Sequence, residues 1–173
     1  WPGQRLLRIR FEQALELQSP NAAEIVAAFG DSDPVSYDGT LLLARAYLAT
    51  GAKAKAAALI RERWREESLD DSFETAVRSE FGDLLTQADH KIRMDRMLYE
   101  ERSAKALRAA DDLGGNQPDI AKAVIAVIKR NAKADEILEQ LPEAAQQDPV
   151  VIYSRIQFLR RAEKIEAAAE LML

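Results

Sequence analysis

One segment of this chain places two helical patterns on either side of a single glycine, and it limits the possible folds more than any other feature. Residues 41–64 read LLLARAYLATGAKAKAAALIRERW. Leu42 and Ala46 predict a first helix, Gly51 predicts a tight turn, and a second helix returns over residues 54–64. Small alanine side chains let two helix axes approach closely, while larger apolar side chains fill the groove between them. The segment therefore predicts an antiparallel helical hairpin.

Related helix-turn-helix patterns recur along the chain. Their turns are expected near residues 51, 101, 131 and 162, at gaps of 50, 30 and 31 residues. The first and last hairpins align when shifted by 111 positions, which pairs Leu48 with Leu159 and Lys53 with Lys164. Recurrent but irregular spacing favours an α-solenoid, a superhelix of tetratricopeptide-like hairpins, over a closed bundle.

Composition supports an all-α fold. Only 7 of the 173 residues are Gly, β-branched runs are almost absent, and strong helix formers dominate. The length fits a single domain over residues 1–173, and the segment Gly114-Gly115-Asn116 is too short for a domain linker. Because the chain starts without Met and stops inside an apolar, helix-favouring run, we expect it to be a piece of a longer protein.

Several classes of site and partner are disfavoured. There is no Cys, which excludes disulfides and thiolate metal sites. The net charge is −5, and the Lys and Arg residues between 89 and 105 alternate with Asp and Glu, so we expect no nucleic-acid partner. No apolar run approaches the roughly 20 residues that a transmembrane helix needs.

Prolines and short polar side chains predict where helices begin. Four prolines follow a candidate capping residue, in Ser19-Pro20, Asp33-Pro34, Gln117-Pro118 and Asp148-Pro149. Thr86 and Asp89 form a capping box, Asp71 and Glu74 indicate another capped helix, and Gly30 is expected to end a helix. A first helix over residues 5–18 is expected to turn Leu6, Leu7, Phe11, Leu15 and also Leu17 toward the core.

Three segments together resemble the α-superhelical region of the soluble lytic murein transglycosylases of alphaproteobacterial type. They are ALIRERWREESLDDSFE (58–74), FGDLLTQADHKIRMDRMLY (81–99) and QDPVVIYSRIQFLRRAEKIEAAAELML (147–173). The resemblance implies a periplasmic parent that cleaves peptidoglycan to 1,6-anhydromuramyl products without a cofactor, using a catalytic domain C-terminal to this region. The partners it implies are the glycan strands and that catalytic domain.

No residue of this chain is assigned a catalytic role. Transglycosylases carry a catalytic Glu-Ser pair followed by Gly-Leu-Met-Gln and Asn-Ala-Gly, but neither follower accompanies Glu67-Ser68 here. His90, the single His, could act as a general base or metal ligand, but a structural position near a helix N-terminus is the preferred interpretation. Adjacent carboxylates such as Glu100-Glu101 point about 100° apart on a helix, which disfavours paired-acid catalysis.

Arg93, Arg96 and Arg102 are the candidate contacts to glycan, its anionic peptide stems or a partner, with surface salt bridges as the alternative. Tyr47, Trp64, Tyr99, Tyr153 and Phe158 are interpreted as core residues rather than as a platform for sugars. The preferred function is a non-catalytic scaffold that positions glycan strands. The alternative is a helical-repeat adaptor whose groove binds a partner's helix or extended peptide.

Overall fold

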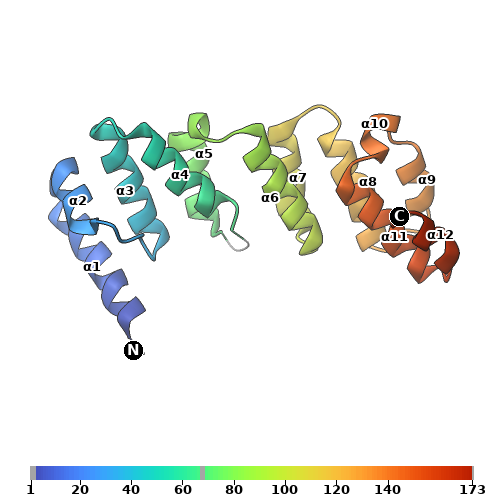
Figure 1. Cartoon of the computed structure of the whole chain (residues 1–173), viewed down its shortest axis with the longest axis horizontal. Coiled ribbons are helices and arrows are strands. Elements are labelled where there is room, and N and C mark those ends of the chain that lie inside the picture. Colours follow the sequence, from blue (N-terminus) through green and yellow to red (C-terminus); the bar gives the residue numbers. More distant parts are fainter. Residues whose placement is uncertain (1–2, 67–68, 173) are drawn as a thin grey trace. The chain divides into compact units, whose positions relative to one another are not determined.

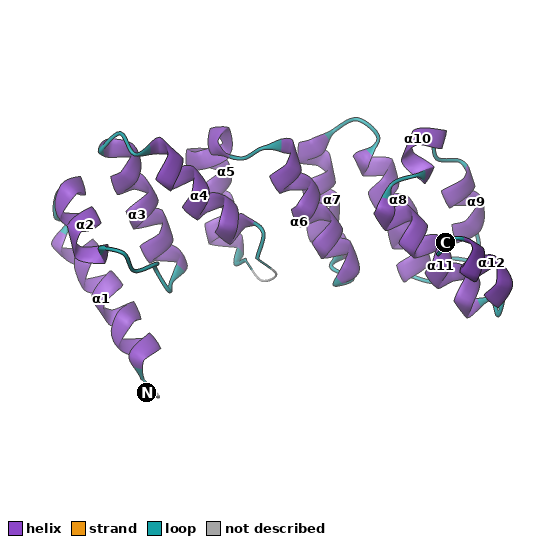
Figure 2. Ribbon diagram, viewed as in Figure 1, coloured by secondary structure: helices purple, strands orange, loops and turns teal. Residues whose placement is uncertain are grey.

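The computed structural model describes residues 3–66 and 69–172, and every regular element in these ranges is helical (Figure 2). The elements are α1 (Gln4–Gln18), α2 (Ala22–Phe29), α3 (Tyr37–Ala49), α4 (Lys53–Trp64), α5 (Asp71–Phe81), the 3-10 turn η1 (Gly82–Leu84), α6 (Gln87–Tyr99), α7 (Ser103–Leu113), α8 (Gln117–Ile128), α9 (Ala134–Glu139), α10 (Glu143–Gln146), α11 (Pro149–Arg161) and α12 (Ile165–Glu170). The predicted all-α fold is confirmed over these ranges.

Contacts within the chain group it into two compact units. Unit 1 covers residues 1–89, unit 2 covers residues 90–173, and the boundary falls inside α6. Each unit is described by itself below. The single domain expected over residues 1–173 stays a prediction.

In unit 1, α3 packs against α1, α2, α4 and α5 (Figure 1). Its larger core cluster contains three fully buried aromatic side chains, Trp64 from α4 with Phe73 and Phe81 from α5. Phe73 also stacks on Tyr37, with ring centroids 4.7 Å apart. Because one large ring fills the space of several aliphatic groups, few side chains are needed to close this core.

In unit 2, α8 is the central helix and packs against α7, α9 and α11 (Figure 1). It is buried nearly all round, from Ile120 to Val127 apart from exposed Lys122, which matches its almost uninterrupted apolar sequence. Its neighbours contribute small side chains, including Ala106 and Ala110 of α7. Small residues at these contacts let the helices approach closely.

Four hairpin turns share one backbone geometry. Gly51, Glu101, Arg130 and Glu163 each adopt a left-handed conformation, with φ of 78°, 59°, 54° and 58°. In every case the next N–H bonds the carbonyl five residues earlier, as in a Schellman motif. These bonds run from Ala52 to Tyr47, Arg102 to Met97, Asn131 to Ala126 and Lys164 to Leu159, at 2.7, 2.8, 2.9 and 2.9 Å.

The turn positions correct the predicted spacing. The left-handed residues lie at 51, 101, 130 and 163, so the gaps are 50, 29 and 33 rather than 50, 30 and 31. The first and last turns correspond at a shift of 112 (51 to 163), not 111. Alanine alignment gave the wrong register because Ala-rich segments match one another at neighbouring shifts.

The predicted helix starts are confirmed where a side chain caps N–H groups only two or three residues away. Thr86 N–H donates to Asp89 Oδ2 at 2.7 Å and Asp89 N–H donates to Thr86 Oγ1 at 3.3 Å, which confirms the capping box of α6. Asp148 caps α11 by accepting from the Val150 N–H at 3.0 Å, with Pro149 as the first helical residue. Gly30 ends α2, as predicted. The start of α8 is displaced by one residue, because Asn116 precedes the helix and Gln117 is its first residue.

The helix starts predicted at Ser19-Pro20 and Asp33-Pro34 are wrong, and the start predicted at Asp71 is displaced by one residue. Ser19 ends α1 in a left-handed conformation, and α2 begins after Asn21, whose capping box with Glu24 is complete. α3 begins after Ser36 rather than at Asp33-Pro34. The cap of α5 is Asp70 instead of Asp71, because the Asp70 carboxylate accepts from the Phe73 N–H at 2.6 Å.

A buried carboxylate from α1 fixes the start of α3. Glu12 accepts hydrogen bonds from the backbone N–H groups of Val35 and Ser36 at 2.8 and 3.0 Å, and from the Ser36 hydroxyl. A negative charge is favourable there because the first N–H groups of a helix lack intrahelical partners. Gly39 makes room for it, since a Cβ on Gly39 would lie 2.6 Å from Glu12 Cδ.

The inner face of α1 therefore differs from the predicted one. Glu12 is buried, whereas Leu6 and Leu7 are 58% and 71% exposed among the described residues. Phe11 is partly buried and packs edge-on against Phe29, with centroids 6.1 Å apart. The apolar periodicity identified the helix, but it could not show that a carboxylate is the side chain turned inward.

A second buried carboxylate joins α4 to the Thr86–Asp89 turn. Asp89 Oδ1 accepts from Arg65 Nε at 2.8 Å, and Asp89 Oδ2 lies 3.4 Å from Arg61 Nε. Burial alone would raise the pKa of Asp89, but the hydrogen bonds from Thr86 and the Arg65 guanidinium outweigh burial and lower it. Asp89 is therefore held as a carboxylate with several donors around it.

Candidate functional site

A recess lined by apolar and polar side chains lies in unit 2, between α8 and α11. It consists of two adjoining cavities of about 160 Å³ and about 470 Å³, which share Val127 and Arg161 in their walls. We call them the first cavity and the second cavity, and together the α8–α11 groove. Ligand sites usually occupy clefts of about 300 to 1,000 Å³, a range that the second cavity reaches.

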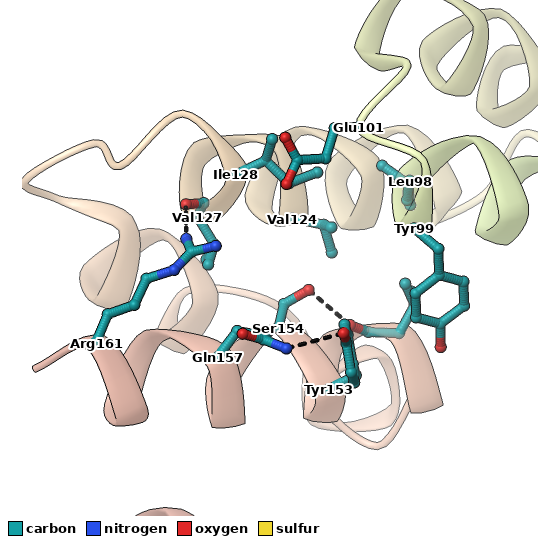
Figure 3. A pocket seen from close by; sticks show the side chains of 11 residues that line it. Leu98, Tyr99, Glu101, Val124, Val127, Ile128, Tyr153, Ser154, Gln157 and Arg161 are labelled. Atoms are coloured by element: carbon teal, nitrogen blue, oxygen red, sulfur yellow. Dashed lines mark hydrogen bonds between the residues drawn. The ribbon is translucent and has the colours of Figure 1, made fainter. Parts of the chain in front are cut away.

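The floor of the first cavity is apolar. It is formed by side chains from α6, α8 and α11, namely Leu98, Val124, Val127 and Ile128 (Figure 3), together with Val150. α8 supplies three of these five residues. Such a floor can hold methyl groups and short side chains, and it offers them no hydrogen bonds.

Two tyrosines flank one end of the first cavity. Tyr99 and Tyr153 pack edge to face, with ring centroids 5.1 Å apart and an angle of 71° between the planes (Figure 3). They remain 52% and 45% exposed, so the interpretation of both as core residues is wrong. Gln157 Nε2 donates to the Tyr153 hydroxyl at 2.8 Å, which orients that phenol.

An acidic cluster supports this aromatic end. Lys91 Nζ lies 2.7 Å from Asp95 Oδ2 and 3.1 Å from Asp148 Oδ1, so it links α6 to the cap of α11. Burial raises the pKa of Asp95, Lys91 opposes that rise, and Asp148 adds to it. Burial also raises the pKa of the Tyr99 phenol, with Asp95 contributing in the same direction. Tyr99 is therefore a neutral donor over the physiological pH range.

Arg161 stands where the two cavities meet. Its Nη1 donates to the Val127 carbonyl at 3.0 Å (Figure 3), which is one of the last carbonyls of α8. The Val127 carbonyl also accepts from the Arg130 N–H at 3.0 Å. Carbonyls at a helix C-terminus attract cations because the helix dipole makes that end negative. The bond fixes one edge of the guanidinium, and Arg161 is exposed and lines both cavities.

The second cavity has a basic lining. Arg130, Asn131 and Arg161 are its polar side chains, and the other described lining residues are Val127, Ala132, Ala134, Phe158 and Ala162. Arg130 sits at the left-handed position of the α8–α9 turn and is exposed. Carboxylates are absent from the described lining of this cavity, whereas the first cavity includes Glu101. The charge of the groove thus changes along its length.

The three predicted arginines lie elsewhere. Arg93 is buried, with 1% of its area exposed, so it offers no surface to a glycan strand. Arg96 is half-buried, and Arg102 is exposed with its Nε 3.0 Å from Glu100 Oε2, as the salt-bridge alternative expects. None of the three lines the described walls of the α8–α11 groove.

The sequence did contain a signal for this groove. Tyr153, Gln157 and Arg161 recur at intervals of four residues, which places them on one face of α11. That pattern indicates a polar stripe beside an apolar face. The sequence analysis did not predict this stripe, because it interpreted each residue by its type and not by its position on a shared helix face.

The remaining candidates have structural positions. His90 is partly buried, with Nδ1 3.6 Å from Asp112 Oδ2, and it joins α6 to α7. Glu67 and Ser68 lie outside the described residues. Within residues 3–66 and 69–172, no three His, Asp or Glu side chains converge as metal ligands would. In the same ranges, no helix has both the length and the apolar character that crossing a bilayer requires.

The described groups of the α8–α11 groove suit binding, because its polar groups are donors and acceptors around an apolar floor. Ser154 also lines the first cavity, and its hydroxyl donates to the Val150 carbonyl at 2.8 Å. Comparisons of the chain with family models, with curated proteins and with solved structures found no match.

Proposed function

We propose that this chain is a helical-repeat scaffold from a periplasmic lytic transglycosylase, and that it positions peptidoglycan strands for a catalytic domain. The observation that carries the scaffold proposal is the recurrence of one turn geometry at residues 51, 101, 130 and 163. Repeated hairpins of this kind stack into α-solenoids, which present extended binding surfaces. The residues that resemble the transglycosylase superhelix supply the identity of the partner.

The α8–α11 groove supports a binding role. It combines exposed tyrosines on α6 and α11, exposed Arg161 on α11, exposed Arg130 in the α8–α9 turn, and an apolar floor formed by helices. Sites built on helices hold their side chains more firmly than sites built on loops. Peptidoglycan, with its sugar rings and anionic peptides, presents partners for each of these groups.

Co-sedimentation with purified peptidoglycan sacculi tests the proposal. We expect residues 1–173 to pellet with sacculi and to release no 1,6-anhydro product. Cellulose fibres, an uncharged glycan without peptides, serve as the control and should leave the protein in the supernatant. Product release that is abolished by a substitution within this chain would overturn the non-catalytic assignment, and equal pelleting with cellulose would overturn recognition of peptidoglycan.

A helical-repeat adaptor is the second candidate, and the apolar floor of the first cavity favours it. Extended peptides and amphipathic helices dock in grooves of this character. The adaptor function predicts that the chain does not pellet with sacculi but binds a defined protein segment through the same groove. The sedimentation experiment therefore separates the two candidates.

A further inference from the structure

The α8–α11 groove carries an asymmetry of charge that the scaffold proposal does not use. The second cavity is lined by Arg130 and Arg161 with no described carboxylate, whereas the first cavity combines an apolar floor with Glu101 at its rim (Figure 3). A ligand that matches both must place negative charge at one end and small apolar groups at the other. We propose that this groove binds the short peptide stems of peptidoglycan, with their carboxylates against Arg161 and Arg130.

Arg161 is the anchor of this site. Its bond to the Val127 carbonyl holds the guanidinium in place before any ligand arrives. A guanidinium can bond a carboxylate through two parallel N–H donors, and such charge-assisted bonds are stronger than neutral ones. Because its position is fixed in advance, less conformational entropy is lost when it binds.

Arg130 adds a second positive charge to the lining of the second cavity. It projects from the α8–α9 turn, where the left-handed backbone places it outside the helix. Asn131 Oδ1 accepts from the Lys133 N–H at 2.9 Å, which fixes the Asn131 side chain with its amide group as a donor. Two guanidinium groups and one amide suit a peptide that carries more than one carboxylate.

The geometry of the first cavity favours the peptide over the sugars. At about 160 Å³ it accommodates small side chains such as the alanine methyls of a stem peptide. Sugars stack on open aromatic faces, but in an edge-to-face pair the edge of one ring covers the face of the other. Tyr99 and Tyr153 are therefore suited to bond a peptide with their hydroxyl groups.

Nucleic acid does not fit the same site. A phosphate backbone needs a series of cations along its path, and the chain as a whole carries a net charge of −5. Two arginines at one end of an apolar groove match a ligand that has charge at one end only.

This inference rests on the proposed function, and calorimetric titration tests it with a defined probe, the tetrapeptide L-Ala-D-Glu-meso-diaminopimelate-D-Ala. We expect Arg161→Gln to weaken binding about tenfold, as loss of one charge-assisted pair would. Arg160→Gln is the matched control, because Arg160 is the exposed neighbour on α11 and lines neither cavity. It should change the affinity less than twofold. Circular dichroism verifies that both variants remain folded.

A second arm separates this inference from the proposed function. Sacculi whose peptides have been removed by an amidase are compared with intact sacculi in the sedimentation assay. Loss of pelleting after peptide removal supports the inference. Equal pelleting with both, together with equal titrations for Arg160→Gln and Arg161→Gln, overturns the peptide site and leaves the scaffold proposal standing. If the protein binds the tetrapeptide but does not pellet with sacculi, the scaffold proposal alone is overturned. If it neither binds the tetrapeptide nor pellets with sacculi, the peptide site and the scaffold proposal are both overturned.

An acidic peptide of ordinary L-residues completes the titration. Weaker binding of this peptide than of the tetrapeptide supports a site for peptidoglycan stems. Equal binding of the two peptides overturns that assignment and indicates that the groove binds an acidic segment of a protein partner.

Discussion

Unit 1 fills the space between its helices with aromatic rings and buried carboxylates, whereas the buried cluster of unit 2 consists of alanine, larger aliphatic side chains and two methionines. Trp64, Phe73 and Phe81 lie at the centre of unit 1, and Glu12 and Asp89 are buried beside its helix starts. In unit 2, alanine supplies eight of the nineteen described residues of the buried cluster, and none of the nineteen is aromatic.

This difference in buried side chains suggests how a groove can remain between packed helices. Alanine allows close approach of helix axes, but its single methyl group fills little of the space beside them. In unit 2 a groove remains between α8 and α11, and Tyr153 and Arg161 are among the residues that line it. In unit 1, large rings and hydrogen-bonded carboxylates occupy buried positions.

The largest expected effect compares a phenylalanine from each unit. Phe73→Ala deletes a fully buried ring and should lower the free energy of unfolding by about 3 to 5 kcal/mol. Phe158→Ala deletes a partly buried ring on the wall of the second cavity, and should cost less than about 2 kcal/mol. Urea denaturation followed by circular dichroism measures both. Equal losses would remove the contrast between the two cores.

The next effect tests the buried carboxylate at the start of α3. Gly39→Ala places a methyl group against Glu12 and should cost about 1 to 3 kcal/mol through overpacking. In a Glu12→Ala background the clash disappears, so a double-mutant cycle should give a coupling free energy of about 1 kcal/mol or more. Gly82→Ala is the control, because a Cβ there meets no atom within 4 Å. Additive single and double variants would contradict the geometry.

A smaller effect contrasts Asp89 with Asp95, which lie on the same helix. The pKa of Asp89 is lowered, so its contribution is present above the unfolded-state pKa and is lost as the pH falls through the folded-state value. The pKa of Asp95 is raised, so its contribution is present below the unfolded-state pKa and is lost as the pH rises through the folded-state value. The two carboxyl groups therefore act in opposite directions.

Asparagine variants measure that contrast between pH 3 and 8. Asp89→Asn should lower the free energy of unfolding by about 1 kcal/mol at neutral pH, as loss of a capping carboxylate does. In this variant the free energy of unfolding should also fall less as the pH is lowered. In Asp95→Asn the free energy of unfolding should still fall at acidic pH. Toward neutral pH this variant should gain stability relative to the unsubstituted protein. Parallel pH profiles for the two variants would contradict the assigned environments.

The smallest effect concerns an exposed ion pair that joins α3 to α5 in unit 1. Arg45 Nε and Nη2 each lie 2.7 Å from a Glu80 carboxylate oxygen, and both side chains are largely solvated. The Arg45 guanidinium lowers the pKa of Glu80 by hydrogen bonding. Arg45→Gln should cost less than about 1 kcal/mol, and about 1 M salt should abolish the difference. A loss as large as that of Gly39→Ala would show that solvated pairs, too, determine the stability of unit 1.

Local chemistry explains which parts of the fold could be predicted. Thr86 with Asp89, and Asp148 with Pro149, specify helix starts through groups only a few residues apart, and both predictions are confirmed. Ser36 caps α3 in preference to Asp33 because Glu12, 24 residues away, holds the Ser36 N–H. Three of the four hairpin turns lack glycine at the left-handed position. The helix patterns still placed the turn at 101 correctly, and placed those at 130 and 163 one residue away, at 131 and 162.

The sequence by itself determined the all-helical class, most of the helices and the local caps, since each depends on side chains within one or two turns of one another. The tertiary structure alone decided that Glu12 turns inward, that Arg93 is buried, and that Tyr99 meets Tyr153 beside a groove that includes Arg161. The reason is physical: burial depends on which helix faces pack together, and those faces come from residues far apart in the chain.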